Sequence, residues 1–153
     1  MSIREDIEKM YKKSLKERNA NSTSTMRLIK SAIKNKDIEA RSLGSKDEIK
    51  EQEILGLLQN LIKQRKDSIE SFKIANRQDL IEKEQIEIQI INIFLPQQKN
   101  EKETENIIIQ LIQEKNLNSL KDMGKLMNYL KTDYSGEIDM GLAGKIAKLK
   151  LSI

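Results

Sequence analysis

The chain has 153 residues, with 28 Lys or Arg and 24 Asp or Glu, a formal net charge of +4, and neither Cys nor His. Without these two residue types there can be no thiol nucleophile, no disulfide, no Ser-His or Cys-His catalysis and none of the usual zinc ligands. Aromatic residues contribute only 3% and charged residues 34%, which favours a helical protein with a core of Ile, Leu and Met and polar outer faces.

The sequence lacks the apolar segments that direct a chain into or across a membrane. Its longest apolar run, residues 90–95, is far shorter than the roughly 20 residues that a helix needs to span a bilayer. The first residues have no apolar signal core, and Glu5, Asp6 and Glu8 argue against a transit peptide. We therefore expect a cytoplasmic protein with no membrane partner, no metal and no cofactor.

Apolar residues at helical spacing predict four helices before the only proline, over about 3–18, 25–40, 45–74 and 78–94. The SIRE sequence at residues 2–5 is a capping box for the first helix. The polar residues 19–24 are expected to break the chain, and residues 45–48 to cap the third helix. Gly56 costs about 1 kcal/mol relative to Ala within a helix, so we expect it to permit close packing.

Pro96 marks the main boundary of the chain. Proline disfavours helical geometry in the residue before it, so the fourth helix should end at Leu95. Beyond it, apolar spacing predicts three shorter helices, over about 101–115, from 119 and from about 139. The predicted fold is all-α, with an N-terminal four-helix lobe (residues 1–96) followed by a C-terminal three-helix bundle (residues 97–153).

One charged residue lies on an apolar stripe of the third predicted helix. Arg65 falls midway between Leu61 and Ile69, and Glu84 holds a similar position on the fourth helix. A hairpin between the helices would bring Arg65 within reach of Glu84 or Glu87. Because an inward charge is costly unless it is paired, we interpret these three residues as a structural ion pair that does not bind RNA.

Positive charge is concentrated toward the ends of the chain. Residues 1–41 contain 11 Lys or Arg and 6 Asp or Glu, whereas residues 42–118 contain 11 and 14. Cations on one side of the second helix can follow the phosphates of a nucleic acid, although such side chains can also serve only solubility. The candidate nucleic-acid-binding residues are Arg27, Lys30, Lys34 and Arg41, their extension Lys63 and Lys66, and a second patch of Lys121, Lys125, Lys145 and Lys148.

The composition also narrows the kind of nucleic acid. Three Tyr and two Phe supply few platforms for the base stacking on which single-strand binders rely. A folded RNA, recognised by its shape and backbone, is the better match.

The sequence contains no catalytic motif that we can identify. The glycines of SGEIDMGLAGK have the spacing of neither a P-loop nor a dinucleotide-binding motif. Acid pairs such as Glu82 and Glu84 are two residues apart, and on a helix such positions point in different directions. We therefore expect a non-catalytic protein.

Three blocks of the sequence resemble the YqeY family in the same order. They are TMRLIKSAIKNKDIEAR, then KQRKDSIESF with RQDLIEKEQIEIQIINIFLPQQ, then KDMGKLMNYLKTDYSGEIDMG. The fold of this family is shared with the tail domain of the GatB subunit of the tRNA-dependent amidotransferase. The resemblance implies the same four-plus-three helix layout and contact with the body of a tRNA, with Lys125 and Lys131 as contacts. Asn128-Tyr129 departs from the family, whose members often carry a smaller residue there.

Three functional hypotheses follow. The first is a helical module that binds tRNA or a tRNA-handling enzyme, such as an aminoacyl-tRNA synthetase or an amidotransferase. The second is a component of tRNA-dependent amidation, a carbon–nitrogen ligase reaction with glutamine as amide donor, although the resemblance reaches only the tail of GatB. The third is a protein–protein adaptor with no role for RNA.

Overall fold

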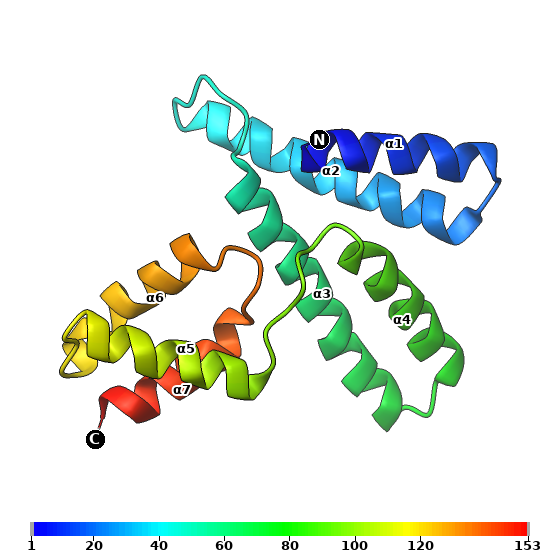
Figure 1. The fold of residues 1–153 in the computed structure, drawn as a ribbon. Coiled ribbons are helices and arrows are strands. Elements are labelled where there is room, and N and C mark those ends of the chain that lie inside the picture. Colours follow the sequence, from blue (N-terminus) through cyan, green and yellow to red (C-terminus); the bar gives the residue numbers. More distant parts are fainter. Residues whose placement is uncertain (1, 153) are drawn as a thin grey trace. The chain divides into compact units, whose positions relative to one another are not determined.

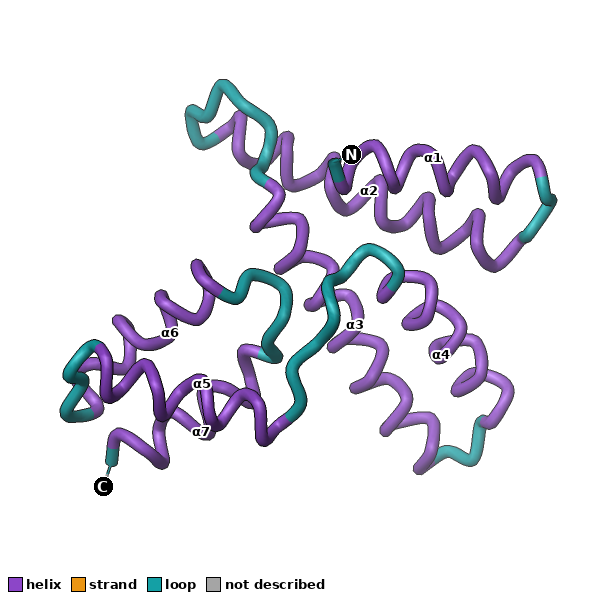
Figure 2. The backbone as a smooth tube through the Cα atoms, viewed as in Figure 1, coloured by secondary structure: helices purple, strands orange, loops and turns teal. Residues whose placement is uncertain are grey.

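The computed structural model describes residues 2–152, and the expected all-α fold is confirmed. The chain forms two compact units, Met1–Leu95 and Pro96–Ile153. The described residues contain no strand, and Figure 2 shows helices joined by loops. The first unit contains α1 (Ile3–Lys16), α2 (Ala20–Ser42), α3 (Glu51–Ile74) and α4 (Gln78–Asn92). The second contains α5 (Glu101–Glu114), the 3-10 helix η1 (Leu120–Asp122), α6 (Met123–Asp133) and α7 (Met140–Leu151).

The first unit consists of two helical hairpins, α1 with α2 and α3 with α4 (Figure 1). The α3–α4 turn passes through Asn76, whose φ of 55° is a left-handed conformation that asparagine tolerates well. Apolar side chains from all four helices and from the loop before α3 form one core. Removing their apolar surface from water stabilises the unit. This core consists of Ile7, Met26, Ile29, Ile33, Ile49, Ile54, Leu58, Ile62 and Ile91.

The second helix begins at Ala20, whereas the sequence predicts a polar break as far as residue 24. The Asn19 side chain caps α2 by accepting a hydrogen bond from the Ser22 backbone N–H at 3.0 Å. Two hydroxyls of this polar start find partners while the backbone stays helical. Ser22 Oγ lies 2.6 Å from Ser14 Oγ of α1, and Thr25 Oγ1 donates to the Asn21 carbonyl at 2.9 Å.

The third helix begins at Glu51, later than the predicted cap at residues 45–48. Ile49 is buried in the core, and its backbone N–H donates to Asp37 Oδ1 at 2.9 Å. Ser45 Oγ accepts from the Asp47 N–H at 3.3 Å in a local turn and does not cap a helix. The segment therefore stays non-helical because one of its backbone groups is bound to a side chain of α2.

Gly56 lies on an exposed side of α3. A Cβ atom built there would meet no atom of another element within 4 Å, so the expectation of close packing at this glycine is wrong. Gly56 is a helix-weakening residue at an open position.

The second unit is a three-helix bundle around a separate core. Asn100 and Glu103 form a capping box at the start of α5, and Asp139 caps α7 by accepting from the N–H groups of Gly141 and Leu142. The Lys99 N–H donates to the Glu137 carbonyl at 2.7 Å, which ties the segment before α5 to the loop before α7. The core consists of Ile108, Leu111, Leu117, Leu126, Leu130, Ile138, Ala143, Ile146, Ala147 and Leu151.

Candidate functional site

Three cations of α2 lie exposed along one side of the helix, and we call Arg27, Lys34 and Arg41 the α2 row. Their spacing of seven residues places successive members about 10 Å apart along the axis and nearly in line. None of the three forms an ion pair or a side-chain hydrogen bond with any residue that the structure describes. The α2 row therefore presents three exposed cations, and the charge of Arg41 also helps to lower the pKa of Asp37.

Lys30 has a different environment from the rest of the predicted set. Its Nζ lies 2.8 Å from Glu8 Oε2 of α1 and 4.2 Å from the centre of the Tyr11 ring. The hydrogen bond from Lys30 holds the pKa of Glu8 below its usual value. Lys30 thus links the two helices of the hairpin and stands apart from the α2 row.

A second link between α1 and α2 involves a pair that sequence reasoning missed. Arg4 Nη1 and Nη2 donate to the two carboxylate oxygens of Asp37 at 3.1 and 2.9 Å, and Nη2 also donates to the Ile49 carbonyl at 3.1 Å. The hydrogen bonds from Arg4, with help from the Ile49 N–H, hold the pKa of Asp37 below its usual value. This network fixes the loop before α3 to both helices of the hairpin.

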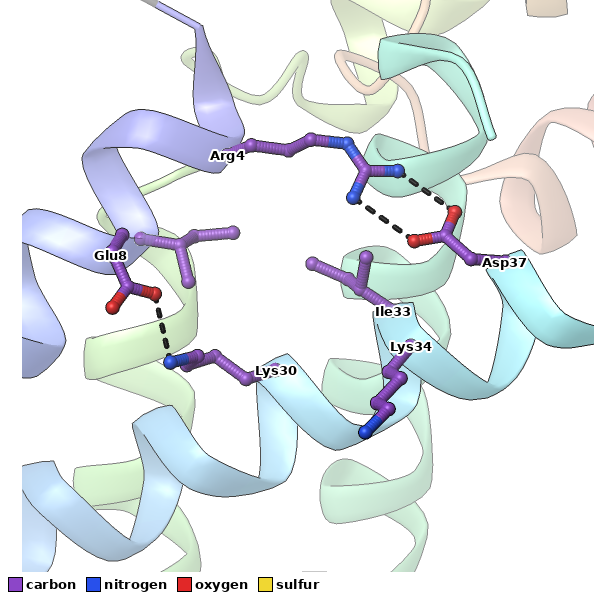
Figure 3. Close-up of a pocket in the computed structure, with 7 residues that line it drawn as sticks. Arg4, Glu8, Lys30, Ile33, Lys34 and Asp37 are labelled. Atoms are coloured by element: carbon purple, nitrogen blue, oxygen red, sulfur yellow. Dashed lines mark hydrogen bonds and ion pairs between the residues drawn. The ribbon is translucent and has the colours of Figure 1, made fainter. Parts of the chain in front are cut away.

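The two links flank an open pocket of about 170 Å³ between α1 and α2 (Figure 3). Arg4 and Asp37 stand on one side of it, and Glu8 and Lys30 stand on the other. Ile7 and Ile33 add apolar surface, and Lys34 of the α2 row also lines the pocket. The pocket thus adjoins one member of the α2 row, Lys34.

Arg65 lies on the inner side of α3, unlike its neighbours Lys63 and Lys66, whose side chains are exposed. Arg65 Nε donates to Glu87 Oε2 at 2.8 Å, and Arg65 Nη1 donates to the Leu61 carbonyl at 3.0 Å. Glu84 Oε2 is farther away, 4.0 Å from Arg65 Nε. The structure therefore brings the three predicted residues together, with Glu87 as the hydrogen-bonded partner.

The two carboxylates near Arg65 differ in their electrostatics. Burial raises the pKa of Glu84 above its usual value, and the charge of Glu87 raises it further, while Arg65 and Lys83 oppose both effects. Only 20% of the Glu84 side chain is exposed, and it accepts no hydrogen bond from Arg65. Glu84 is thus a partly buried carboxylate without the hydrogen bond from Arg65 that Glu87 accepts.

The remaining predicted cations belong to the second unit. Lys145 and Lys148 lie three residues apart on the exposed side of α7, beside Leu149, which is also exposed. All of these lysines have exposed side chains: Lys121 on η1, Lys125 and Lys131 on α6, and Lys145 and Lys148 on α7. They are spread over three elements of a unit that contains no residue of the α2 row.

The geometry gives no sign of a metal centre or a membrane span within the part of the chain that the structure describes. Residues 2–152 contain no group of three or more Asp or Glu side chains that could hold a metal ion. None of the described helices is long and apolar enough to cross a membrane.

Fold and site together define a two-unit helical protein with an exposed basic row on its first hairpin. A model of the family described as Yqey-like protein matches residues 4–151, so the chain belongs to the YqeY family. It is 35% identical over 130 residues to altered inheritance of mitochondria protein 41, mitochondrial, of Lachancea thermotolerans, covering 81% of this chain and 67% of that protein.

Two further relatives match shorter stretches. An uncharacterized protein of Schizosaccharomyces pombe is 36% identical over 91 residues, covering 60% of this chain and 70% of that protein. Altered inheritance of mitochondria protein 41, mitochondrial, of Vanderwaltozyma polyspora is 39% identical over 72 residues, covering 47% and 37%.

The expected cytoplasmic location is contradicted by these comparisons, because two of the relatives are named as mitochondrial proteins. The expectation depended on early acidic residues, which the structure accounts for in another way. Glu5 and Asp6 lie in the first turn of α1, where negative charge stabilises a helix, and Glu8 pairs with Lys30. The fold of α1 thus accounts for all three acidic residues.

Proposed function

We propose that this protein is a non-catalytic helical module that binds folded RNA, with tRNA as the leading candidate, through the α2 row. The observation that carries the proposal is the exposure of Arg27, Lys34 and Arg41 on one side of a single helix, without ion-pair partners among the described residues. Cations that are not already neutralised can replace the counterions condensed on phosphates, and the release of those counterions drives binding.

The neighbouring residues support this assignment. Lys30 already has a carboxylate partner in Glu8, so its charge is less available to a phosphate than that of Arg27 or Lys34. The α2 row is also straight over two intervals of seven residues, which suits contact with a regular backbone. Lys63 and Lys66 on α3 are exposed and are proposed to add a weaker, non-directional attraction.

Filter binding over a range of salt concentrations tests the proposal. The probes are tRNA, including mitochondrial tRNA, and an RNA duplex of equal length. We expect tighter binding to tRNA and an affinity that falls steeply with salt. Equal affinity for the two probes, with no salt dependence, contradicts the proposal.

A protein–protein adaptor is the second candidate, and one observation favours it. Ile38, 53% exposed, lies beside the α2 row, and Leu43, 82% exposed, follows the end of the same helix. Exposed apolar side chains near a charged patch are typical of surfaces that bind proteins. Pull-downs with and without nuclease separate the candidates, since a partner held through RNA is lost on digestion and a direct protein partner is retained.

A further inference from the structure

Helix α4 is apolar on two opposite sides, although the core of the first unit accounts for only one of them. The helix packs against α3 and α2, and Figure 1 shows α3 alongside it as the other arm of a hairpin. Ile81 and Ile91 are buried on this inner side, and Ile88 packs against the core that contains Ile91. A surface helix ordinarily has a polar side opposite its apolar one, so the isoleucines on the outer side need a separate explanation.

The outer side of α4 presents Ile86, Ile90 and Ile93, which we call the α4 stripe. Their spacing of four and three residues places all three on one side of the helix. Ile86 is 39% exposed and Ile93 is 60% exposed, while Ile90 is partly buried beside the core. Positions i, i+4 and i+7 are those by which an amphipathic helix binds along an apolar surface of another protein.

The charge of α4 limits what can cover this stripe. The helix contains four carboxylates and a single cation, Lys83. Three of the carboxylates have a cation of the first unit beside them. The fourth, Glu82, is exposed, lies four residues before Ile86 on the same side, and forms no ion pair with any residue that the structure describes.

Glu82 and the isoleucines together select the class of partner. RNA phosphates and anionic lipid headgroups are repelled by a carboxylate, so neither suits this surface. A protein segment that combines apolar side chains with Lys or Arg is complementary both to the α4 stripe and to Glu82.

We propose that the α4 stripe binds a basic amphipathic helix of a partner protein. Burial of the three isoleucines supplies the attraction, and Glu82 pairs with a Lys or Arg of the partner and so fixes the direction of the partner helix. The stripe lies on a different helix from the α2 row and has the opposite charge beside it. The inference therefore goes beyond the proposed RNA-binding function and does not depend on it.

The test uses two fluorescein-labelled peptides of identical Leu and Lys composition. In one, the order of residues forms a basic amphipathic helix, and in the other the same residues are shuffled so that no helical period remains. Fluorescence anisotropy should show the amphipathic peptide binding at least about tenfold more tightly, because only its leucines can meet the stripe together. Equal affinity for the two peptides would show attraction by charge alone and overturns the proposal.

A matched pair of double variants locates the binding surface. Ile86→Ser with Ile93→Ser should weaken binding of the amphipathic peptide at least about tenfold, because it removes the two exposed anchors. Both positions are exposed, so the variant should keep the helical circular dichroism of the parent. Leu120→Ser with Leu149→Ser removes two leucines of the second unit that are similarly exposed, 48% and 67%, and it should bind like the parent.

A charge reversal tests the role of Glu82 with every isoleucine in place. Glu82→Lys should weaken binding of the basic peptide, and it should bind a peptide with Glu at every Lys position more tightly than the parent does. Glu101→Lys, at an exposed position of α5, makes the same change of net charge and should leave the affinity for both peptides unchanged.

Sedimentation over a range of protein concentrations examines the other possible occupant, a second copy of this chain. A monomeric parent supports the proposal, whereas self-association that is lost in Ile86→Ser with Ile93→Ser assigns the stripe to a second copy and overturns it. Peptide binding that is unchanged in this variant also overturns it. The variant should bind tRNA like the parent, so failure of the partner site and failure of RNA binding are separate results.

Discussion

Arg65 of α3 and Glu87 of α4 form a hydrogen-bonded ion pair across the α3–α4 hairpin, with 2.8 Å between Arg65 Nε and Glu87 Oε2. Only 9% and 15% of their side chains are exposed. Removing one partner of such a pair leaves the other charge partly buried and unpaired. The pair therefore links α3 to α4, and each charge offsets the cost of burying the other.

The first prediction concerns Arg65 itself. Arg65→Ala should lower the free energy of unfolding by about 3–5 kcal/mol, because it leaves the Glu87 carboxylate unpaired beside Glu84 in a poorly solvated position. Urea denaturation followed by circular dichroism measures the loss. Lys63→Ala and Lys66→Ala, at exposed positions of the same helix, should each change stability by less than about 0.5 kcal/mol. Parent-like unfolding of Arg65→Ala, with RNA binding lost, would assign Arg65 to the binding surface instead.

The second prediction distinguishes the two carboxylates. Glu87→Gln should cost about 1.5–3 kcal/mol, the usual contribution of a hydrogen bond to a charged group. Glu84→Gln should be neutral or stabilising at pH 7, because Glu84 is held charged in a site that burial makes unfavourable for its charge.

The sign of the pH dependence provides a separate check on Glu84. A carboxyl group whose pKa is raised on folding contributes stability below its unfolded pKa and loses it as the pH rises through its folded pKa. The stability of Glu84→Gln relative to the parent should therefore increase from pH 4 to pH 7. A relative stability that decreases over this range would mean that the charged form of Glu84 is favoured by folding.

The third prediction concerns Asp37, whose lowered pKa has the opposite consequence. Its stabilising effect is present above the unfolded pKa of about 3.9 and is lost as the pH falls through the lower folded value. Asp37→Asn should thus be less stable than the parent at pH 7, and the difference should shrink as the pH falls below about 4. Asp67→Asn, at an exposed position of α3, is the matched control. A difference independent of pH would contradict the role of the Arg4–Asp37 pair.

The fourth prediction is that Gly56→Ala stabilises the protein by about 1 kcal/mol. The position is helical, exposed and open around the missing Cβ, so alanine gains helix propensity without a clash. Gly44→Ala should have the opposite effect, because Gly44 has a φ of 97°, a conformation that residues with a Cβ rarely adopt. Thermal unfolding of both variants checks the pair, and a destabilised Gly56→Ala would indicate a contact that the exposed surface does not reveal.

Helical periodicity was enough to predict the all-α fold and the α3–α4 hairpin, since both depend on apolar spacing along single helices. The sequence pattern places the start of α2 too late because the partner of Ser22 is Ser14, on the preceding helix. Composition alone marks such a hydroxyl-rich segment as a break. The sequence pattern places the start of α3 too early because that start depends on a hydrogen bond between the Ile49 N–H and Asp37 of α2.

The candidate site, too, could be predicted only where its residues lie on one helix. The spacing of Arg27, Lys34 and Arg41 could be read directly, because all three lie on one helix. Lys30 shares that spacing, yet Glu8 and Tyr11 of α1 engage it, and nothing in a linear pattern indicates which residues of α1 face it. The Arg4–Asp37 pair spans 33 residues, and its register is set by the turn between α1 and α2. The sequence pattern therefore does not determine which residues of different helices contact each other.

The α2 row is tested most directly by the salt dependence of RNA binding in a triple variant, Arg27→Gln, Lys34→Gln and Arg41→Gln. Loss of three phosphate contacts should reduce the slope of log Kd against log salt concentration by about 2 to 3. The control is a triple variant with the same change of net charge at exposed positions outside the row, Lys46→Gln, Lys83→Gln and Lys102→Gln. We predict weak binding with a shallow slope for the row variant and a parent-like slope for the control. A row variant that binds tRNA with the affinity and slope of the parent would contradict the account.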